Sequence, residues 1–306
     1  MKNLNFPGGS WPVMLTPFTK ENKVDFPALK ELVGWYLDNG VSGLFSACQS
    51  SEIFFLSLEE RLEIARKTVE YAGGTVPIIA SGHVSDDIKG QIEELREMAK
   101  TGVDAVILIT NRLAKEGESD QIWIENCQRI LDSLDPDIPL GFYECPYPYK
   151  RLLTPKTIRW CVGTGRFYFL KDTCCDMEMI AARLDLLKGS HMKLYNANTT
   201  TLLESMRTGA AGFCGVMDNF HPGLYTWLCC HYQDQKAEEI SAFLTVASLI
   251  ERQYYPVNAK YHLNQNEGLP ITTFCRTKDG GGLTETFKKE VDMLNCMAKN
   301  KMKQLQ

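Results

Sequence analysis

Short apolar runs alternate with amphipathic stretches along the first 220 residues of the chain. Runs rich in β-branched and aromatic residues are typical of strands buried in a parallel sheet. Stretches with apolar residues at helical spacing predict helices that bury one face. The predicted strands lie at about 11–15, 43–46, 76–80, 104–109, 139–143, 166–171, 191–195 and 212–216.

Helix starts and ends support this alternation. The stripe at 58–72 follows Ser57, with Glu60 three residues later, which is a capping box. The next stripe begins just after Ser85 and Asp86, either of which could cap it.

A weak repeat marks three helix-to-strand junctions: NGVSGLF at 39–45, TGVDAVI at 101–107 and TGAAGFC at 208–214. In each, a glycine is placed to supply the left-handed residue after a helix. Eight alternations with short turns favour a (β/α)8 TIM barrel over an open sheet. After residue 220 the strand patterns stop, and periodic segments at about 222–252 and 283–300 predict helices, with a flexible glycine loop at 279–282 between them. The sequence therefore predicts a catalytic barrel at 1–220, followed by its last helix and a C-terminal helical extension at 221–306 within the same domain.

The composition mainly excludes classes of partner and site. A formal charge of -5 gives no electrostatic footprint for nucleic acid or anionic lipid. No apolar run reaches the length of a membrane span, and the first residues lack a signal-peptide pattern, so we expect a cytoplasmic protein. Eleven scattered cysteines without C-x-x-C predict mostly buried thiols, not disulfides, and the pairs at 174–175 and 229–230 are expected to pack in the core or between helices. The five histidines have no zinc-binding spacing, so we expect neither a metal nor another cofactor.

Candidate chemistry begins with RFYFLKDT at 166–173, where an aromatic run ends in Lys171. Strand alternation places Phe167, Phe169 and Lys171 on one face, and Asp172 on the other. Burying an ammonium is costly unless it is paired or loses its proton. A solvated lysine just beyond the sheet is the ordinary alternative.

Barrel active sites lie at the carboxyl ends of the strands. Lys171 ends the sixth predicted strand and Tyr143 the fifth, and the loop ACQSSE at 47–52 follows the second. A desolvated lysine supplies the neutral amine that attacks a ketone, and a nearby tyrosine can pass protons. Backbone N–H groups and hydroxyls of the loop could hold a carboxylate. Together these features predict imine catalysis on an α-keto acid.

Four segments, in order, resemble one family. They are VSGLFSACQSSEIFFLSLEER at 41–61, GFYECP around Tyr143, FLKDT around Lys171, and LYNANTTTLLESMRTGAAGFCG at 194–215. The chain is thereby similar to the N-acetylneuraminate lyase / dihydrodipicolinate synthase family of class I, pyruvate-dependent aldolases.

The resemblance implies a lyase in which Lys171 forms the Schiff base and Tyr143 relays protons. It implies a pyruvate-like 2-oxo acid substrate and a homotetramer built as a dimer of dimers, with no nucleic acid or membrane partner. The residues it implies for substrate binding are Ala47, Cys48, Gln49, Ser50, Thr110, Gly215 and Val216. Glu52 is expected to anchor the loop through backbone N–H groups.

The chain also departs from the family pattern. Gln49 and Ser50 stand where two hydroxyl residues are usual, and Thr110 where a relay tyrosine is usual. Pro148 replaces the arginine that binds the synthase's second substrate, and Thr199 with Thr200 replaces two acidic residues of the neuraminate lyase. These differences argue against both namesake activities.

Two alternatives stay open. The same imine could support dehydration of a 2-keto-3-deoxy sugar acid. A non-catalytic binding or regulatory barrel is the alternative outside enzymology. Its test is whether another hydroxyl, from Tyr147 or Tyr149, takes the place of Thr110 beside Tyr143.

Overall fold

Eight parallel strands form the centre of the molecule in a computed structural model that describes residues 5–305. Each strand is short and almost entirely buried, as expected for strands covered by helices on one side and by their own barrel interior on the other. The strands are β1 Gly9–Ser10, β2 Leu44–Phe45, β3 Ile78–Ser81, β4 Ala105–Ile109, β5 Leu140–Tyr143, β6 Phe167–Asp172, β7 Lys193–Asn196 and β8 Gly212–Phe213.

The strands follow one another around the sheet in chain order, and β1 pairs with β8. A parallel bridge between Val13 and Phe45 joins the first strand segment to β2, which closes the barrel. The (β/α)8 prediction is therefore confirmed. The predicted first strand at 11–15 is displaced: regular pairing occupies only residues 9 and 10, and the following segment contributes single bonds such as Met14 N–H to Phe45 O.

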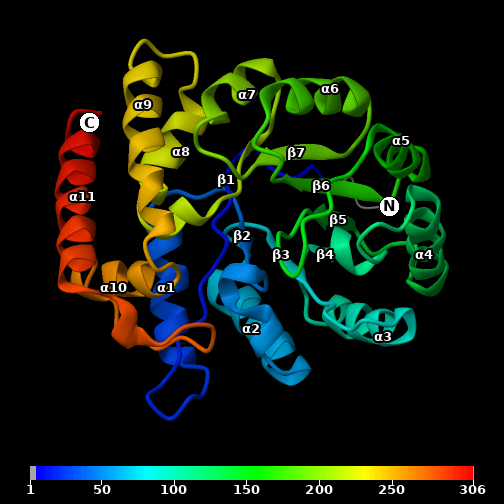
Figure 1. The fold of residues 1–306 in the computed structure, drawn as a ribbon, viewed down its shortest axis with the longest axis horizontal. Coiled ribbons are helices and arrows are strands. Elements are labelled where there is room, and N and C mark those ends of the chain that lie inside the picture. Colours follow the sequence, from blue (N-terminus) through cyan, green and yellow to red (C-terminus); the bar gives the residue numbers. More distant parts are fainter. Residues whose placement is uncertain (1–4, 306) are drawn as a thin grey trace.

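Helices α2 to α7 follow one another around the outside of the strands (Figure 1). The capping box of Ser57 and Glu60 is confirmed at the start of α2. The predicted caps of α3 are wrong, because Asp87 accepts the hydrogen bond from Gly90 N–H at that end. The helices of this ring and of the part that precedes it are α1 Phe26–Asp38, α2 Leu58–Ala72, α3 Ile88–Ala99, α4 Asp120–Ser133, α5 Pro155–Thr164, α6 Met177–Leu187 and α7 Leu202–Thr208.

From Phe169 onward, the side chains of β6 alternate between the inside and the outside of the barrel. Phe169 packs inside the barrel, and Lys171 lies over the ring of Tyr143, which belongs to the same inner cluster. Asp172 contacts Arg183 of α6 outside the barrel. The placement of Phe167 beside them was wrong. A register shift between Leu140 and Gly141 on β5 moves Phe167 to the outer core.

Beyond residue 220 the chain is helical, as predicted, but the periodic segment at 222–252 is divided in three. It forms α8 Pro222–Cys230, α9 Ala237–Ala247 and a 3-10 turn η5 at Ser248–Arg252, and is followed by α10 Val257–Gln265 and α11 Glu285–Lys303. Helices α9, α10 and α11 lie together on one side of the barrel (Figure 1). The glycine tract expected to be a flexible loop forms a 3-10 turn at Gly280–Gly282, with Asp279 accepting from Gly281 N–H.

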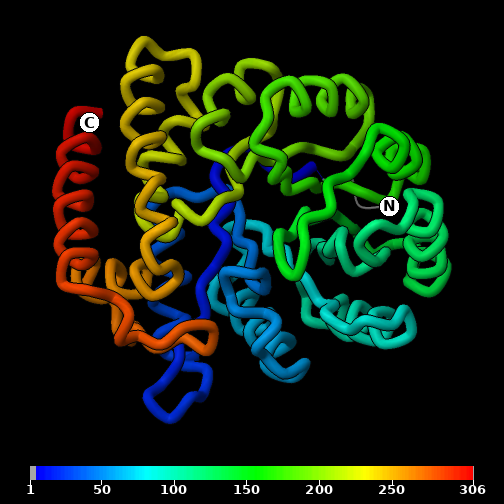
Figure 2. The backbone as a smooth tube through the Cα atoms, in the orientation of Figure 1, coloured from blue at the N-terminus to red at the C-terminus, as the bar shows by residue number. Residues whose placement is uncertain are grey.

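The C-terminal part is tied to the loop after β2 by one carboxylate. Glu52 has a left-handed backbone with φ 63°, and its buried side chain accepts from Lys260 Nζ at 2.8 Å. The same carboxylate accepts from Arg276 N–H at 2.6 Å and Thr277 N–H at 2.9 Å. Figure 2 shows this orange segment crossing beside the blue segment that precedes α1. There the Arg276 guanidinium donates to Asn22. The anchoring role expected for Glu52 therefore rests on contacts with segments more than 200 residues away.

All eleven cysteines are free thiols, and seven of them are buried. The cysteine pairs at 174–175 and 229–230 differ from the predicted packing, because Cys175 and Cys230 are exposed. Within residues 5–305, no helix has both the length and the hydropathy needed to cross a membrane.

Candidate active site

Lys171 lies at the carboxyl end of β6, and only 4% of its surface is exposed. Its ammonium lies 4.2 Å from the centroid of the Tyr143 ring and 5.7 Å from that of Phe45. None of the ion pairs formed within residues 5–305 includes it. The Lys171 amine therefore lies among aromatic rings and not in solvent. The solvated alternative for this lysine is wrong.

Tyr143 is the neighbour of Lys171 across the sheet, since the two residues are paired in the β5–β6 register. Its phenol donates to Gln49 Oε1 at 3.3 Å, and the Cys145 thiol donates to the same oxygen at 3.3 Å. Burial, reinforced by Cys145 and Cys48, raises the pKa of Tyr143 well above its usual range. The phenol therefore keeps its proton at neutral pH and can act as a proton donor.

The loop after β2 forms a 3-10 turn, η1 at Gln49–Ser51, which faces Lys171 and Tyr143 through Gln49. Ser51 fixes the turn, because its hydroxyl contacts Ser46 O at 2.6 Å and Met14 O at 2.7 Å. Cys48 packs inside the barrel, whereas the side chain of Ala47 belongs to the outer core. Of the predicted loop ligands, Ala47 therefore places its side chain outside the barrel interior.

One contact of this loop, between Ser50 and Tyr255, comes from the C-terminal part and was missed by the sequence analysis. Burial raises the pKa of Tyr255 well above its usual range, while its hydrogen bond with Ser50 lowers it. The Tyr255 phenol also accepts from Asn219 Nδ2 at 3.1 Å. No local pattern around Tyr255 marks it as a partner of a loop 200 residues earlier.

Asp218, in the turn η4 Val216–Asn219 after β8, is a second missed residue. Its carboxyl is fully buried; Oδ1 accepts from Ser10 Oγ at 2.7 Å, and Oδ2 has no hydrogen-bond partner among the described residues. Burial raises its pKa well above the usual range, whereas Ser10 and the charge of Lys171 lower it.

Among residues 5–305, no other hydroxyl hydrogen-bonds to Tyr143 in the place of the missing relay tyrosine. Thr110 is buried, but its hydroxyl donates to Arg151 O at 2.6 Å. Tyr149 donates to Asn111 O at 3.0 Å, and Tyr147 packs edge-on against Phe54 at the surface. Within the described part of the chain, the hydrogen-bond partner of Tyr143 is the amide of Gln49.

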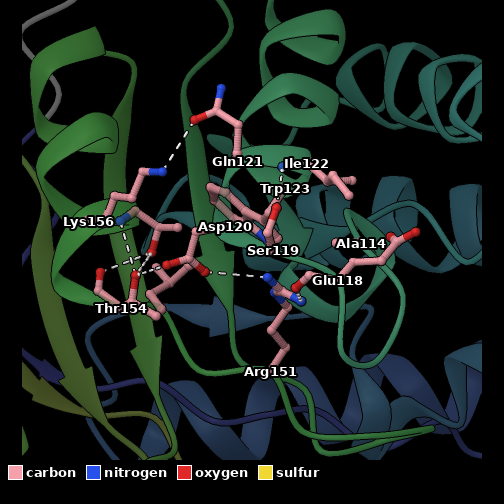
Figure 3. A network of polar contacts seen from close by, with 12 residues as sticks. Ala114, Glu118, Ser119, Asp120, Gln121, Ile122, Trp123, Arg151, Thr154 and Lys156 are labelled. Carbon is pink, nitrogen blue, oxygen red and sulfur yellow. Dashed lines mark hydrogen bonds and ion pairs between the residues drawn. The ribbon is translucent and has the colours of Figure 1, made fainter.

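Arg151, the arginine nearest to the position occupied by Pro148, points away from the barrel centre. Its guanidinium donates to Glu118 O at 3.0 Å and lies 3.4 Å from Asp120 Oδ1 (Figure 3). Thr154 completes this network by donating to Asp120 Oδ2 at 2.6 Å. Arg151 therefore ties two loops together and is not free to bind a substrate carboxylate.

Gly215 and Val216 lie just beyond β8. A Cβ at Gly215 would lie 2.2 Å from the Phe213 ring and 2.7 Å from Ala197 O, so tight packing alone requires glycine there. Thr199, at the end of β7, shares a 2.8 Å hydrogen bond with Tyr225 of α8. Residues 5–305 contain no cluster of three or more acidic, histidine or cysteine side chains that could hold a metal ion.

Comparison with known proteins agrees with this geometry. A sequence model described as the dihydrodipicolinate synthetase family matches residues 6–292. Among curated proteins, the chain is similar to a 4-hydroxy-tetrahydrodipicolinate synthase of Clostridium tetani. The two are 27% identical over 265 residues, which is 83% of this chain and 87% of the relative.

Solved structures show the same fold. A dihydrodipicolinate synthase from Acinetobacter baumannii, complexed with pyruvate, superposes with a TM-score of 0.85 at 23% identity, covering 95% of this chain and 99% of the other. A prophage protein of the dihydrodipicolinic acid synthase family from E. coli K12, also in complex with pyruvate, gives a TM-score of 0.85 at 22% identity. Here the coverage is 95% and 98%.

Proposed function

The chain belongs to the dihydrodipicolinate synthetase family, whose members are lyases of the class I aldolase type, and from that premise we propose that Lys171 is its Schiff-base residue. The observation that carries this proposal is the buried, unpaired amine lying 4.2 Å from the centroid of the Tyr143 ring. Imine formation needs both a neutral amine and a proton donor beside it.

In the proposed reaction, the Lys171 amine attacks the C2 carbonyl of a 2-oxo acid and forms a carbinolamine. The Tyr143 phenol donates a proton to the carbinolamine hydroxyl, which leaves as water, and the iminium remains on Lys171. The iminium then accepts the electron pair of a bond at C3, either when a C–C bond breaks or when a C3 proton leaves. The resulting enamine can be protonated or can attack an aldehyde.

The loop at 48–51 is the proposed carboxylate site, with Ser50 and the amide of Gln49 as the proposed donors. Gln49 also accepts the Tyr143 hydrogen bond, so it orients the proton donor. We propose that the second substrate differs from those of the dihydrodipicolinate synthases and sialic acid lyases. Pro148 carries no charge, Arg151 is engaged with the loop before α4, and Thr199 is engaged with Tyr225. The homotetramer remains an expectation to be tested by light scattering.

The test is reductive trapping. The protein is incubated with pyruvate and sodium borohydride, and then intact mass and peptide masses are measured. We expect one reduced pyruvate unit on the peptide that contains Lys171 and none in Lys171→Ala. Modification mapped to Lys193 would refute the proposal, because burial lowers the pKa of that amine and makes it the alternative nucleophile.

Tyr143→Phe separates the role of the proton donor from that of the Lys171 amine. We expect this variant to form the imine at least 10²-fold more slowly, the order of magnitude that a positioned proton donor contributes. If neither pyruvate nor longer 2-oxo acids label the wild type, the non-catalytic barrel becomes the better description of this protein.

A further inference from the structure

One buried guanidinium on the outside of the barrel joins the two strands that carry Lys171 and Tyr143. Arg183 of α6 places NH2 2.8 Å from Glu144 Oε1 and NH1 3.1 Å from Glu144 Oε2. NH1 also contacts Asp172 Oδ2, and NH2 donates to Leu153 O at 2.8 Å. Both carboxylates are fully buried, and only 3% of the Arg183 side chain is exposed.

The two carboxylates directly follow the two candidate catalytic residues in the chain. Glu144 follows Tyr143 on β5, and Asp172 follows Lys171 on β6. Because successive side chains of a strand point to opposite faces, each outward carboxylate is linked to its inward neighbour through a single peptide unit. Tyr143 and Lys171 are also paired in the sheet register. The spacing between the two inward groups is therefore coupled to the spacing between the two carboxylates that Arg183 holds.

The remaining carboxylate contacts fix the ends of both strands. Glu144 accepts from Leu153 N–H at 2.7 Å and from Thr173 N–H at 3.0 Å. Asp172 Oδ1 accepts from Cys174 N–H at 2.9 Å. Burial and the charge of Asp172 raise the pKa of Glu144, while Arg183 lowers it. A single cation that serves two acids is thus the central member of a network in which every carboxylate oxygen is used.

We propose that Arg183 is a positioning residue for imine chemistry: it sets the separation of the Lys171 amine and the Tyr143 phenol by clamping Glu144 and Asp172. This inference rests on the proposed function. Arginine is required because its planar fork contacts Glu144 twice while reaching Asp172, which the single ammonium of lysine cannot do. A displacement of about 1 Å between reacting groups can cost roughly 10²-fold in rate.

Arg183→Lys tests the proposal, and Arg61→Lys is its matched control. Arg61 is also a buried arginine of an outer helix; it contacts Glu94 Oε1 at 3.0 Å and Gly82 O at 2.9 Å. Glu94 likewise accepts two backbone N–H groups, but it follows neither candidate catalytic residue. Both substitutions keep the positive charge and replace the forked guanidinium with a single ammonium. They are therefore expected to lower the unfolding free energy similarly.

The rate readout is exchange of the pyruvate methyl protons with deuterium, followed by proton NMR, since exchange requires the iminium and a proton transfer. Borohydride trapping at long incubation times reports whether Lys171 still forms the imine, and urea unfolding reports stability. We expect Arg183→Lys to be trapped fully but to exchange about 10²-fold more slowly than wild type. Arg61→Lys should exchange within about threefold of wild type, which is the precision needed to separate it from a 10² effect.

An Arg183→Lys exchange rate close to wild type, or an equal loss in Arg61→Lys, would overturn the positioning role. If Arg183→Lys does not fold, Glu144→Gln is measured instead, because it keeps the shape of the side chain and weakens the clamp; wild-type exchange in that variant overturns the proposal as well. A wild type that is neither trapped nor able to exchange protons, with pyruvate or with longer 2-oxo acids, refutes the proposed function itself. A trapped wild type with an unimpaired Arg183→Lys refutes only the role of Arg183.

Discussion

Asp218→Asn should change the pH dependence of stability in a direction that the structure fixes. The folded carboxyl is buried with one oxygen unpartnered, and burial raises its pKa well above the usual range. The unfolded carboxyl ionises near pH 4. Above that pH the unfolded state loses a proton that the folded state keeps, so the stability of the wild type falls as pH rises. The asparagine cannot ionise and escapes this penalty.

The magnitude follows from proton linkage. One proton held only by the folded state lowers the unfolding free energy by about 1.4 kcal/mol for each pH unit over which it stays bound. The asparagine can still accept the hydrogen bond from Ser10. The asparagine amide takes the place of the unpartnered oxygen, and the free-energy cost of burying that amide is the same at every pH. The constant offset therefore cancels, and only the pH-dependent part tests the argument.

Urea unfolding at pH 5, 6, 7 and 8, followed by circular dichroism, measures the effect. We expect the unfolding free energy of Asp218→Asn minus that of the wild type to increase with pH, by up to about 1.4 kcal/mol per pH unit. Asp137→Asn is the control, because Asp137 is exposed and should give a difference independent of pH. A difference that stays constant or shrinks with pH would mean that the folded carboxyl is ionised and stabilised by Lys171, contrary to the argument.

Three further predictions concern stability: the first two are measured by urea unfolding, and the third by whether the variant yields soluble, folded protein. Glu52→Gln should lower the unfolding free energy by about 3–5 kcal/mol, since it leaves the Lys260 ammonium buried without its anion; a loss below 1 kcal/mol would contradict this. Gly34→Ala, within α1 where a Cβ meets nothing within 4 Å, should stabilise the protein by about 0.5–1 kcal/mol. Gly212→Ala should fail to fold, because its Cβ would lie 1.9 Å from Gly9 O, and a soluble, stable variant would refute the tight β1–β8 contact.

The barrel could be predicted from sequence because its strands carry a local signal. Segments such as 104–109 and 139–143 are apolar throughout, which parallel strands buried on both faces require. The first strand was displaced because Trp11 and Val13 pair only singly with their neighbours, although their composition is that of a strand. Phe167 was misplaced because a register shift opposite it breaks the alternation, and apolar patterns do not encode such shifts.

The candidate site was predictable only where its geometry is local. Lys171 and Tyr143 each end a strand, so their approach follows from the topology of parallel strands. Gln49 was identified as a loop residue, but its hydrogen bond to Tyr143 was not. Tyr255 and Asp218 approach the site from turns, and Arg183 lies outside the barrel behind it. No periodicity in those segments indicates which distant group each one contacts.

The hydrogen bonds accepted by the Glu52 carboxylate have a consequence for the order of folding. This carboxylate joins residues 208 to 225 positions apart in the chain, so the contacts that hold the loop are among the least local in the molecule. Such contacts form late, because the closure entropy of the intervening chain must be overcome first. Lys260 and Arg276 are also synthesised long after the strands that carry Lys171 and Tyr143. The pair proposed to form the imine can therefore be in place before the loop proposed to hold the substrate carboxylate, and a newly made barrel would complete this proposed site last.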